Sequence, residues 1–387
     1  MSDNSSLHTY DVCIVGAGAS GLVSAIKIKD LAPEITVALI EKNQAPGRKV
    51  AAAGNGRCNL SNLECTDWKR TSAFFSSIGL ITRVSSEGRI YPYSEDGRDV
   101  VRCLVNACRE RGVEILTRRN VVSVTRGTHG FIVSTEFNKP KAYRLTEDDA
   151  PYDIGCKAVL VATGGKSKPE LGSTGDGYRF AKALGHSIET LIPVLTGVET
   201  SEDIKALGLS GIRQKGRVSL YKSEELIFQD EGEVQFTDYG LSGIVILDLS
   251  RFLEGKDLSD YTISIDFAPE IAEGSIVSPF SIVKEPIARV ILDKSVMSEA
   301  PAMQIKDFRL SPVGLRGWDM AQVTRGGVPL DEVDSATCGS LFVPGLYFSG
   351  EVLDVDYQCG GFNLQNAWTT GLLAGEGIAE YIRELRK

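Results

Sequence analysis

The chain has 387 residues, of which 42% are hydrophobic and 24% charged, and it carries a formal net charge of −9 with a pI near 5.1. This is an ordinary globular composition with room for two or three domains, and its acidic balance argues against a nucleic-acid partner. The sequence contains no uninterrupted run of about 18 apolar residues, so no membrane span is expected. The N-terminal segment lacks the basic and apolar parts of a signal peptide. We therefore expect a cytoplasmic protein.

The first elements predict a βαβ unit. Residues 10–16 form a short apolar, β-branched run that ends in glycine, which is typical of a buried strand. Residues 20–31 carry apolar side chains at helical spacing, and residues 35–41 form a second strand. Two strands joined through a helix indicate the beginning of a parallel sheet.

A long loop is expected over residues 42–62, followed by helices near 67–79 and 97–111. Residues 113–136 predict strands separated by a turn at "RGTHG", and residues 156–165 predict an apolar strand that ends in paired glycines. The strands belong to the same α/β pattern as the first unit.

The composition changes after about residue 190. Short alternating runs continue to about residue 270 and predict a small antiparallel β unit, and helices are expected from Ser278 and Pro279 onward. Residues 345–354 return to the strand-then-glycine pattern. We therefore expect a discontinuous nucleotide-binding domain, 1–190 and 325–387, around an inserted substrate or cap domain, 191–324, that is β-rich to about residue 270 and then helical.

The glycine loop "GAGASG" lies between the first strand and the first helix. Gly16 would make the tight turn, Gly18 would let a pyrophosphate approach the backbone, and Gly21 would let the helix pack on the strand. Glu41 ends the next strand, where a carboxylate can hold a ribose hydroxyl. This context predicts a bound dinucleotide at the helix N-terminus; the simpler alternative is a glycine turn at a helix–sheet junction.

A second glycine-rich segment lies close to the C-terminus. Gly350 and Glu351 follow a strand, and residues 360–363, "GGFN", open a helix. A nicotinamide dinucleotide would not need a second site so far along the chain, whereas the flavin of FAD must be held by another part of the fold. The N–H groups of the helix at "GGFN" could face flavin N1 and O2, where reduced flavin is negative. The alternative is a sharp loop that caps a core helix.

These segments resemble a known family. The motifs "GAGASGL", "GNGRCNLSN", "GRIYPYS", "FTDYGLSG", "VTRGGV" and "LYFSGEVLDVDYQCGGFNLQNAW" stand in the order of the BaiN/YhiN-like family of bacterial NAD(P)/FAD-dependent oxidoreductases and span nearly the whole chain. The resemblance implies an α/β fold with a Rossmann-like FAD-binding domain of glutathione-reductase type. It also implies an inserted β-rich lobe and a small helical piece that covers the flavin.

The resemblance further implies a set of cofactor-binding residues. Carried over position by position, they are Gly16, Gly18, Ser20, Gly21, Glu41, Lys42, Arg48, Gly56, Arg57, Cys58, Asn59, Thr163, Gly164, Gly165, Gly350, Glu351, Asp354, Gly361, Phe362, Asn363 and Leu364. Two more follow from the residues themselves. Lys49 beside Arg48 can neutralise a pyrophosphate, and Val122, on the strand after "TRRN", can offer a backbone contact to adenine.

Three positions depart from the family pattern. Asn55 stands where a third glycine is usual, and asparagine is the next best residue for a left-handed backbone. Asp238 replaces a histidine and Ile244 a proline, both within the inserted lobe where the substrate should lie. The substrate of a characterised relative should therefore not be transferred to this chain.

The sequence does not identify the catalytic acid or base. Tyr91 and Tyr93 could line the substrate pocket or simply pack around Pro92, Asp238 could be a desolvated base or a turn residue, and Cys359 could be a thiol at the flavin or an unreactive loop residue. No cysteines form a CxxC pair and there are only three histidines, so no metal site is expected.

The expected function is that of an FAD-dependent oxidoreductase, with hydride passing through flavin N5. The family resemblance favours NAD(P)H-dependent reduction of an activated C=C or C=O in a small organic substrate. "GSTGDGYRFAKALG" is not followed by an acid-terminated strand, so NAD(P)H would dock transiently rather than occupy its own domain. An oxygen-using oxidase of an amine or aminoketone and a non-enzymatic flavin-binding redox module remain alternatives, and the oligomeric state stays open.

Overall fold

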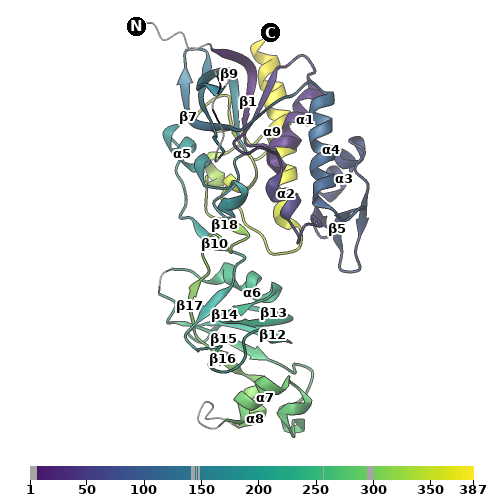
Figure 1. The fold of residues 1–387 in the computed structure, drawn as a ribbon, viewed down its shortest axis with the longest axis vertical. Coiled ribbons are helices and arrows are strands. Elements are labelled where there is room, and N and C mark those ends of the chain that lie inside the picture. Colours follow the sequence, from purple (N-terminus) through teal and green to yellow (C-terminus); the bar gives the residue numbers. More distant parts are fainter. Residues whose placement is uncertain (1–6, 141–143, 145, 147–148, 256, 294–299) are drawn as a thin grey trace. The chain divides into compact units, whose positions relative to one another are not determined.

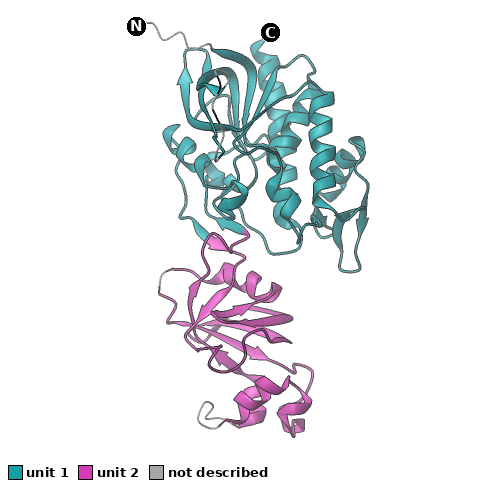
Figure 2. Ribbon diagram, in the orientation of Figure 1, with its two compact units in different colours: residues 1–192, 323–387 teal, residues 193–322 magenta. Residues whose placement is uncertain are grey.

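The computed structural model describes residues 7–140, 144, 146, 149–255, 257–293 and 300–387. The chain divides into two compact units (Figure 2): Met1–Ile192 with Val323–Lys387, and Pro193–Gln322. The sequence placed these boundaries at residues 190 and 325. Each unit has its own hydrophobic core.

The first unit is built on a seven-stranded sheet in the order β6-β2-β1-β9-β8-β7, with β19 pairing on β9. The pairs of β6, β2, β1, β9 and β19 are parallel, whereas β8 pairs antiparallel with both β7 and β9. The central strands read as continuous apolar runs because helices and loops cover both of their faces. The strands are β1 (His8–Val15), β2 (Val37–Glu41), β6 (Glu114–Thr117), β7 (Arg119–Gly127), β8 (Gly130–Phe137), β9 (Tyr152–Val161) and β19 (Leu346–Phe348).

Helices α1, α4 and α9 lie side by side against this sheet (Figure 1). Helix α9 carries small residues along one face, and there its backbone approaches that of α1. The side chain of Trp368 is fully buried and donates a hydrogen bond from Nε1 to the carbonyl of Leu60 at 2.9 Å. The helices of the unit are α1 (Ala19–Leu31), α2 (Arg48–Ala52), α3 (Trp68–Ser77), α4 (Gly97–Glu110), α5 (Asp176–Ala183) and α9 (Phe362–Leu385).

The loop expected over residues 42–62 is not wholly irregular. It contains α2 and ends in β3 (Ser61–Asn62), which joins a small antiparallel sheet with β5 (Arg89–Pro92) and β4 (Thr82–Val84). The expectation of a continuous loop was therefore wrong. The short elements lack the periodicity of long ones, because they are held by tertiary contacts rather than by local pattern.

The second unit is an antiparallel sheet in the order β16-β15-β12-β13-β14-β11-β17. The expectation of an antiparallel β unit was correct, but the stretch after residue 270 is not only helical, since β16 and β17 return to the sheet. The strands are β11 (Val198–Thr200), β12 (Arg213–Lys222), β13 (Glu225–Thr237), β14 (Gly240–Ser242), β15 (Tyr261–Asp266), β16 (Phe308–Leu310) and β17 (Pro312–Leu315), and the helices are α6 (Ile244–Leu249), α7 (Glu285–Leu292) and α8 (Pro301–Lys306).

The chain passes between the units at two places, marked by β10 (Ile192–Val194) and β18 (Val323–Arg325), which pair as a two-stranded sheet. Within the described ranges, no helix combines the length and the apolar character needed to cross a membrane.

Candidate cofactor site

The glycines of the first glycine loop have two different surroundings. Gly16 has φ +106°, and a Cβ there would lie 2.5 Å from the carbonyl oxygen of Ala162. A Cβ on Gly21 would lie 2.0 Å from the carbonyl oxygen of Gly16. A Cβ on Gly18, in contrast, would meet nothing within 4 Å. Gly16 and Gly21 are therefore required by the packing of the chain on itself, whereas Gly18 borders open space at the N-terminus of α1.

Glu41 ends β2 directly beneath this loop. Its carboxylate accepts hydrogen bonds from the backbone N–H of Ala17 at 3.3 Å and from Asn43, through the backbone N–H at 2.8 Å and the side-chain amide at 2.7 Å. Burial raises the pKa of the Glu41 carboxyl, and the bonds from Asn43 and Ala17 oppose that shift. The acid thus stands where the fingerprint predicts, next to the loop backbone.

The second glycine segment meets the first at the start of α1. The hydroxyl of Ser20 donates to the carbonyl of Ser349 at 3.3 Å, and the N–H of Gly350 donates to the hydroxyl of Thr370 on α9 at 2.9 Å. Gly350 has φ +75°, and a Cβ there would lie 2.8 Å from Ser20 Oγ. The two glycine loops, more than 300 residues apart in sequence, are therefore neighbours.

Glu351 lies at the junction of three segments. Its carboxylate pairs with Lys49 Nζ of α2 at 2.7 Å and accepts a hydrogen bond from the backbone N–H of Thr324 at 2.9 Å. A Cβ on Gly165 would lie 2.6 Å from Glu351 Oε1, so the glycine is needed for this approach. Three residues later, the backbone N–H of Asp354 donates a hydrogen bond to the carbonyl of Val328 at 2.9 Å.

The loop "GNGRCN" faces the start of α9. Asn55, Gly56 and Cys58 all have positive φ, at 55°, 85° and 57°, so the asparagine that departs from the family pattern does adopt the left-handed backbone. Gly361 also has a positive φ of 102°, and a Cβ on it would lie 2.6 Å from the carbonyl of Ser61 and 2.9 Å from Asn59 Oδ1. Burial raises the pKa of the Cys58 thiol to about 12.

Helix α9 begins immediately after Gly361, so the backbone N–H groups of Phe362, Asn363 and Leu364 belong to its first turn. The Asn363 side chain does not point outward as a free donor. Its amide donates to the carbonyl of Tyr357 at 2.8 Å, and its oxygen accepts from the Tyr357 N–H at 3.0 Å. Asn363 therefore fixes the loop that leads into the helix.

A second group of predicted residues gathers around α5. Lys42 Nζ pairs with Asp176 at 2.7 Å, and Arg179 donates to the carbonyl of Val122 at 2.7 Å. Arg48 is exposed and donates to Asn43 Oδ1 at 2.8 Å. Thr163 and Gly164 continue from β9 toward this group, and Gly164 has φ +72°.

The residues present fit FAD. A Cβ on Gly18 or on Gly56 would meet no atom within 4 Å, so the backbone is accessible to a ligand at two separated points. In the described part of the chain, Asn59 Oδ1 and Ser349 Oγ are buried atoms without a hydrogen-bond partner, and both belong to the converging loops. A buried polar atom without a partner carries a desolvation cost that a bound polar group would remove. Of the described residues, no cluster suits a metal ion.

The four weak catalytic candidates have different surroundings. Tyr91 is buried, with its hydroxyl accepting from Arg57 at 3.3 Å and the guanidinium 4.7 Å from its ring centre. Tyr93 is 67% exposed, and Cys359 is partly exposed in the loop before Gly360. Asp238 lies in the second unit, where it is exposed and accepts a hydrogen bond from Ser210.

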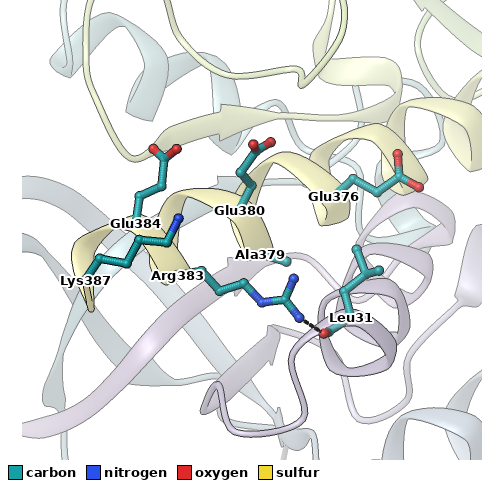
Figure 3. Close-up of a pocket in the computed structure, with 7 residues that line it drawn as sticks. All are labelled: Leu31, Glu376, Ala379, Glu380, Arg383, Glu384 and Lys387. Carbon is teal, nitrogen blue, oxygen red and sulfur yellow. Dashed lines mark hydrogen bonds between the residues drawn. The ribbon is translucent and has the colours of Figure 1, made fainter.

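A cavity of about 390 Å³ lies elsewhere, between the last turn of α1 and the C-terminal half of α9 (Figure 3). Leu31, Glu376, Ala379 and Arg383 are among the residues that line it. The glycine loops lie at the opposite ends of both helices, and α9 with its 24 residues is about 36 Å long. The cavity is therefore separate from the candidate cofactor site.

Several residues of the site were not predicted. Thr324, Asp176 and Arg179 contact predicted residues but were not themselves named, although Asp176 and Arg179 lie in the glycine-rich segment "GSTGDGYRFAKALG", which the sequence favours as a segment that wraps FAD or shapes the floor of the active site. The motif "VTRGGV" contains Thr324 and was the only sequence signal that could have pointed to it.

Comparison with known proteins gives a consistent result. The family model of the HI0933-like protein Rossmann domain matches residues 10–377. A 3-dehydro-bile acid delta(4,6)-reductase of Clostridium scindens is 31% identical over 95% of this chain and 98% of its own length. Ribosomal RNA dihydrouridine synthases of Haemophilus influenzae and Escherichia coli are 29% and 26% identical, over 95% and 96% of this chain and 98% of each relative.

Solved structures share the fold at low identity. A flavocytochrome c3 fumarate reductase matches 98% of this chain and 79% of its own with a TM-score of 0.54 and 16% identity. An Escherichia coli quinol fumarate reductase matches 98% of this chain and 71% of its own with a TM-score of 0.53 and 15% identity. At these identities the likeness concerns the fold alone.

Proposed function

The chain belongs to the HI0933-like family and is an FAD-dependent oxidoreductase, and from that premise we propose that it reduces a C=C bond conjugated with a carbonyl in a small organic molecule, with NAD(P)H as the electron donor. The observation that carries the proposal is the 31% identity, over nearly the full length of both chains, to a relative named as a delta(4,6)-reductase of a 3-dehydro-bile acid. That name describes reduction of double bonds conjugated with a carbonyl.

The geometry supports this reaction type. Bound FAD would supply hydride chemistry at flavin N5. The α9 N-terminus offers backbone N–H groups to negative charge, and the loop before it is held by Asn363. Hydride addition to a conjugated double bond places negative charge on the carbonyl oxygen, which then needs a donor. Arg57, stacked on Tyr91 beside the open backbone of Gly56, is a cationic donor of the required kind.

A uracil base in RNA is the second candidate substrate, because two relatives are named ribosomal RNA dihydrouridine synthases. The double bond lost in dihydrouridine is also conjugated with a carbonyl, so the same chemistry applies. One structural feature favours this candidate. The guanidinium of Arg57 lies over the ring of the buried Tyr91, and the guanidinium of Arg83 lies 5.8 Å from the ring centre of the exposed Tyr93. Stacked arginine and aromatic side chains are typical of surfaces that hold unpaired bases.

The deciding experiment is anaerobic. The holoprotein is mixed with NADH, with NADPH or with one of a panel of amines while flavin absorbance is followed, and the reduced protein is then mixed with a 4,6-dien-3-one steroid, with uridine, with unmodified ribosomal RNA, or with oxygen. Flavin bleaching by a nicotinamide and rapid recovery with the dienone would support the main proposal, and recovery with RNA alone would favour the second candidate. Bleaching by amines, with recovery only by oxygen, would contradict both and identify an oxidase.

A further inference from the structure

Thr324 lies on the strand by which the chain returns from the second unit, yet its contacts are with the candidate cofactor loops. Its side chain is fully buried. Its hydroxyl oxygen accepts hydrogen bonds from the backbone N–H groups of Lys166 at 2.8 Å and of Ser167 at 3.1 Å, and its own N–H donates to Glu351 Oε1 at 2.9 Å.

These bonds connect two loops that follow different strands of the sheet. Lys166 and Ser167 follow the "ATGG" turn of β9, and Glu351 follows β19. The fit around the residue is close. A Cβ on Gly165 would lie 2.4 Å from the Thr324 hydroxyl oxygen, and the hydroxyl of Ser167 is 3.1 Å from the same atom.

The residues that follow Thr324 make further contacts with the segment after β19. Arg325 pairs with Asp356 through Nε at 2.9 Å. The N–H of Val328 donates to the carbonyl of Val352 at 2.9 Å. A Cβ on Gly327 would lie 2.5 Å from the carbonyl of Val352, so this glycine too is needed for the approach. The segment 323–328 is thus attached along the stretch from Glu351 to Asp356.

We propose that Thr324 is a positioning residue of the FAD site: it holds the Gly164–Ser167 loop and the Glu351 carboxylate in the arrangement that receives the cofactor, and it thereby links FAD binding to the order of the connection at β18. The proposal rests on the proposed function, since it assumes FAD at these loops. Because binding linkage is reciprocal, FAD must stabilise the β18 segment to the same extent that the correct β18 segment favours FAD.

The test compares Thr324→Val with Thr324→Ser. Valine keeps the shape but removes the acceptor of the Lys166 and Ser167 N–H groups, the second of which is buried, whereas serine keeps the acceptor. Titration of apoprotein with FAD, followed by flavin fluorescence, should show about tenfold or weaker binding for Thr324→Val, a loss equal to about 1.4 kcal/mol, and near wild-type binding for Thr324→Ser. Thr135→Val is the matched control, because Thr135 is a buried threonine on β8 whose hydroxyl donates to the carbonyl of Tyr152.

A second measurement needs no variant. Hydrogen exchange of peptides covering residues 322–328 in the wild-type protein should slow when FAD is added. Equal FAD affinity for the valine and serine variants, or unchanged exchange of this segment in protein that binds FAD, would overturn the inference while leaving the proposed function intact. Failure of the wild-type protein to bind FAD at all would instead contradict the proposed function.

Discussion

The hydroxyl of Ser24 donates a hydrogen bond of 2.7 Å to the carbonyl oxygen of Gly371, 347 residues later in the chain. One helical turn closer to the glycine loop, a Cβ on Gly371 would lie 2.7 Å from the carbonyl of Ser20. The N-terminal half of α1 is therefore in backbone contact with α9 at Gly371, the tenth residue of that helix. The hydroxyl of Ser20 at the start of α1, the end expected to face a pyrophosphate, also bonds to Ser349, in the segment that leads to the end of α9 expected to face the flavin.

Replacement of Gly371 by alanine should separate these helices. The added methyl group would overlap backbone atoms that cannot rotate away, so we expect a loss of roughly 1–3 kcal/mol in the free energy of unfolding, the usual range for overpacking. Urea denaturation of the apoprotein measures this loss. Gly274→Ala serves as the control, because a Cβ there would meet nothing within 4 Å, and equal stability of the two variants would disprove the close contact.

Glu41 should contribute to cofactor affinity. If its carboxylate accepts a hydrogen bond from the adenosine ribose, Glu41→Ala should weaken FAD binding by roughly 1.5–3 kcal/mol, the scale for a bond to a charged group. The variant also loses the bonds from Ala17 and Asn43, so titration must use the folded fraction shown by circular dichroism. Glu114→Gln, on the neighbouring strand β6 and exposed, should bind FAD normally. Unchanged affinity of Glu41→Ala would remove the ribose assignment.

The fold of the first unit could be predicted from sequence where local pattern determines it. Gly16 was assigned to the tight turn and Gly21 to packing of the helix on the strand, and the positive φ of Gly16 and the close backbone beside Gly21 agree with both assignments. The partners of Lys49 and Glu351 could not be predicted in the same way. They lie 302 residues apart, and only the tertiary arrangement of α2 and the loop after β19 brings their charges together.

The contacts of polar side chains were the hardest to predict from the sequence. Thr324 was missed because a threonine in a short strand gives no periodic signal, and its role depends on which backbone N–H groups the fold places beside it. Tyr91 was open between pocket lining and packing, and the structure buries it against Arg57. Asp238 could be located only within its own unit, where it contacts Ser210.

Alkylation should distinguish the buried Cys58 from the partly exposed Cys65 and Cys359. Burial raises the pKa of Cys58 to about 12, so iodoacetamide at pH 8 should leave Cys58 unmodified in the native protein. Cys65 and Cys359 are partly exposed and should react. If Cys359 lies near the flavin, added FAD should slow its modification but not that of Cys65, as followed by peptide mass spectrometry. Equal rates with and without FAD would place Cys359 away from the cofactor.

Asp11 should make stability depend on pH. Burial alone would raise its pKa, but hydrogen bonds from Lys157 and Thr36 outweigh burial and hold the pKa below its ordinary value of 3.8. A lowered native pKa means that the unfolded chain binds more protons, so the contribution is present above pH 3.8 and is lost as the pH falls through the native value. Asp11→Asn should therefore cost about 1–3 kcal/mol at pH 7 and less below pH 4. A cost that stays constant with pH would contradict this account.

The most direct measurement is FAD titration of Gly18→Ala against wild-type apoprotein, with unfolding curves for both and for Gly21→Ala. The account predicts one FAD per wild-type chain. It also predicts that Gly18→Ala unfolds like the wild type, because its methyl group meets no protein atom, but binds FAD at least about tenfold more weakly, since the methyl enters the space of the pyrophosphate. Gly21→Ala should be destabilised even without FAD. Wild-type affinity of folded Gly18→Ala for FAD would contradict the assignment of this loop to the cofactor.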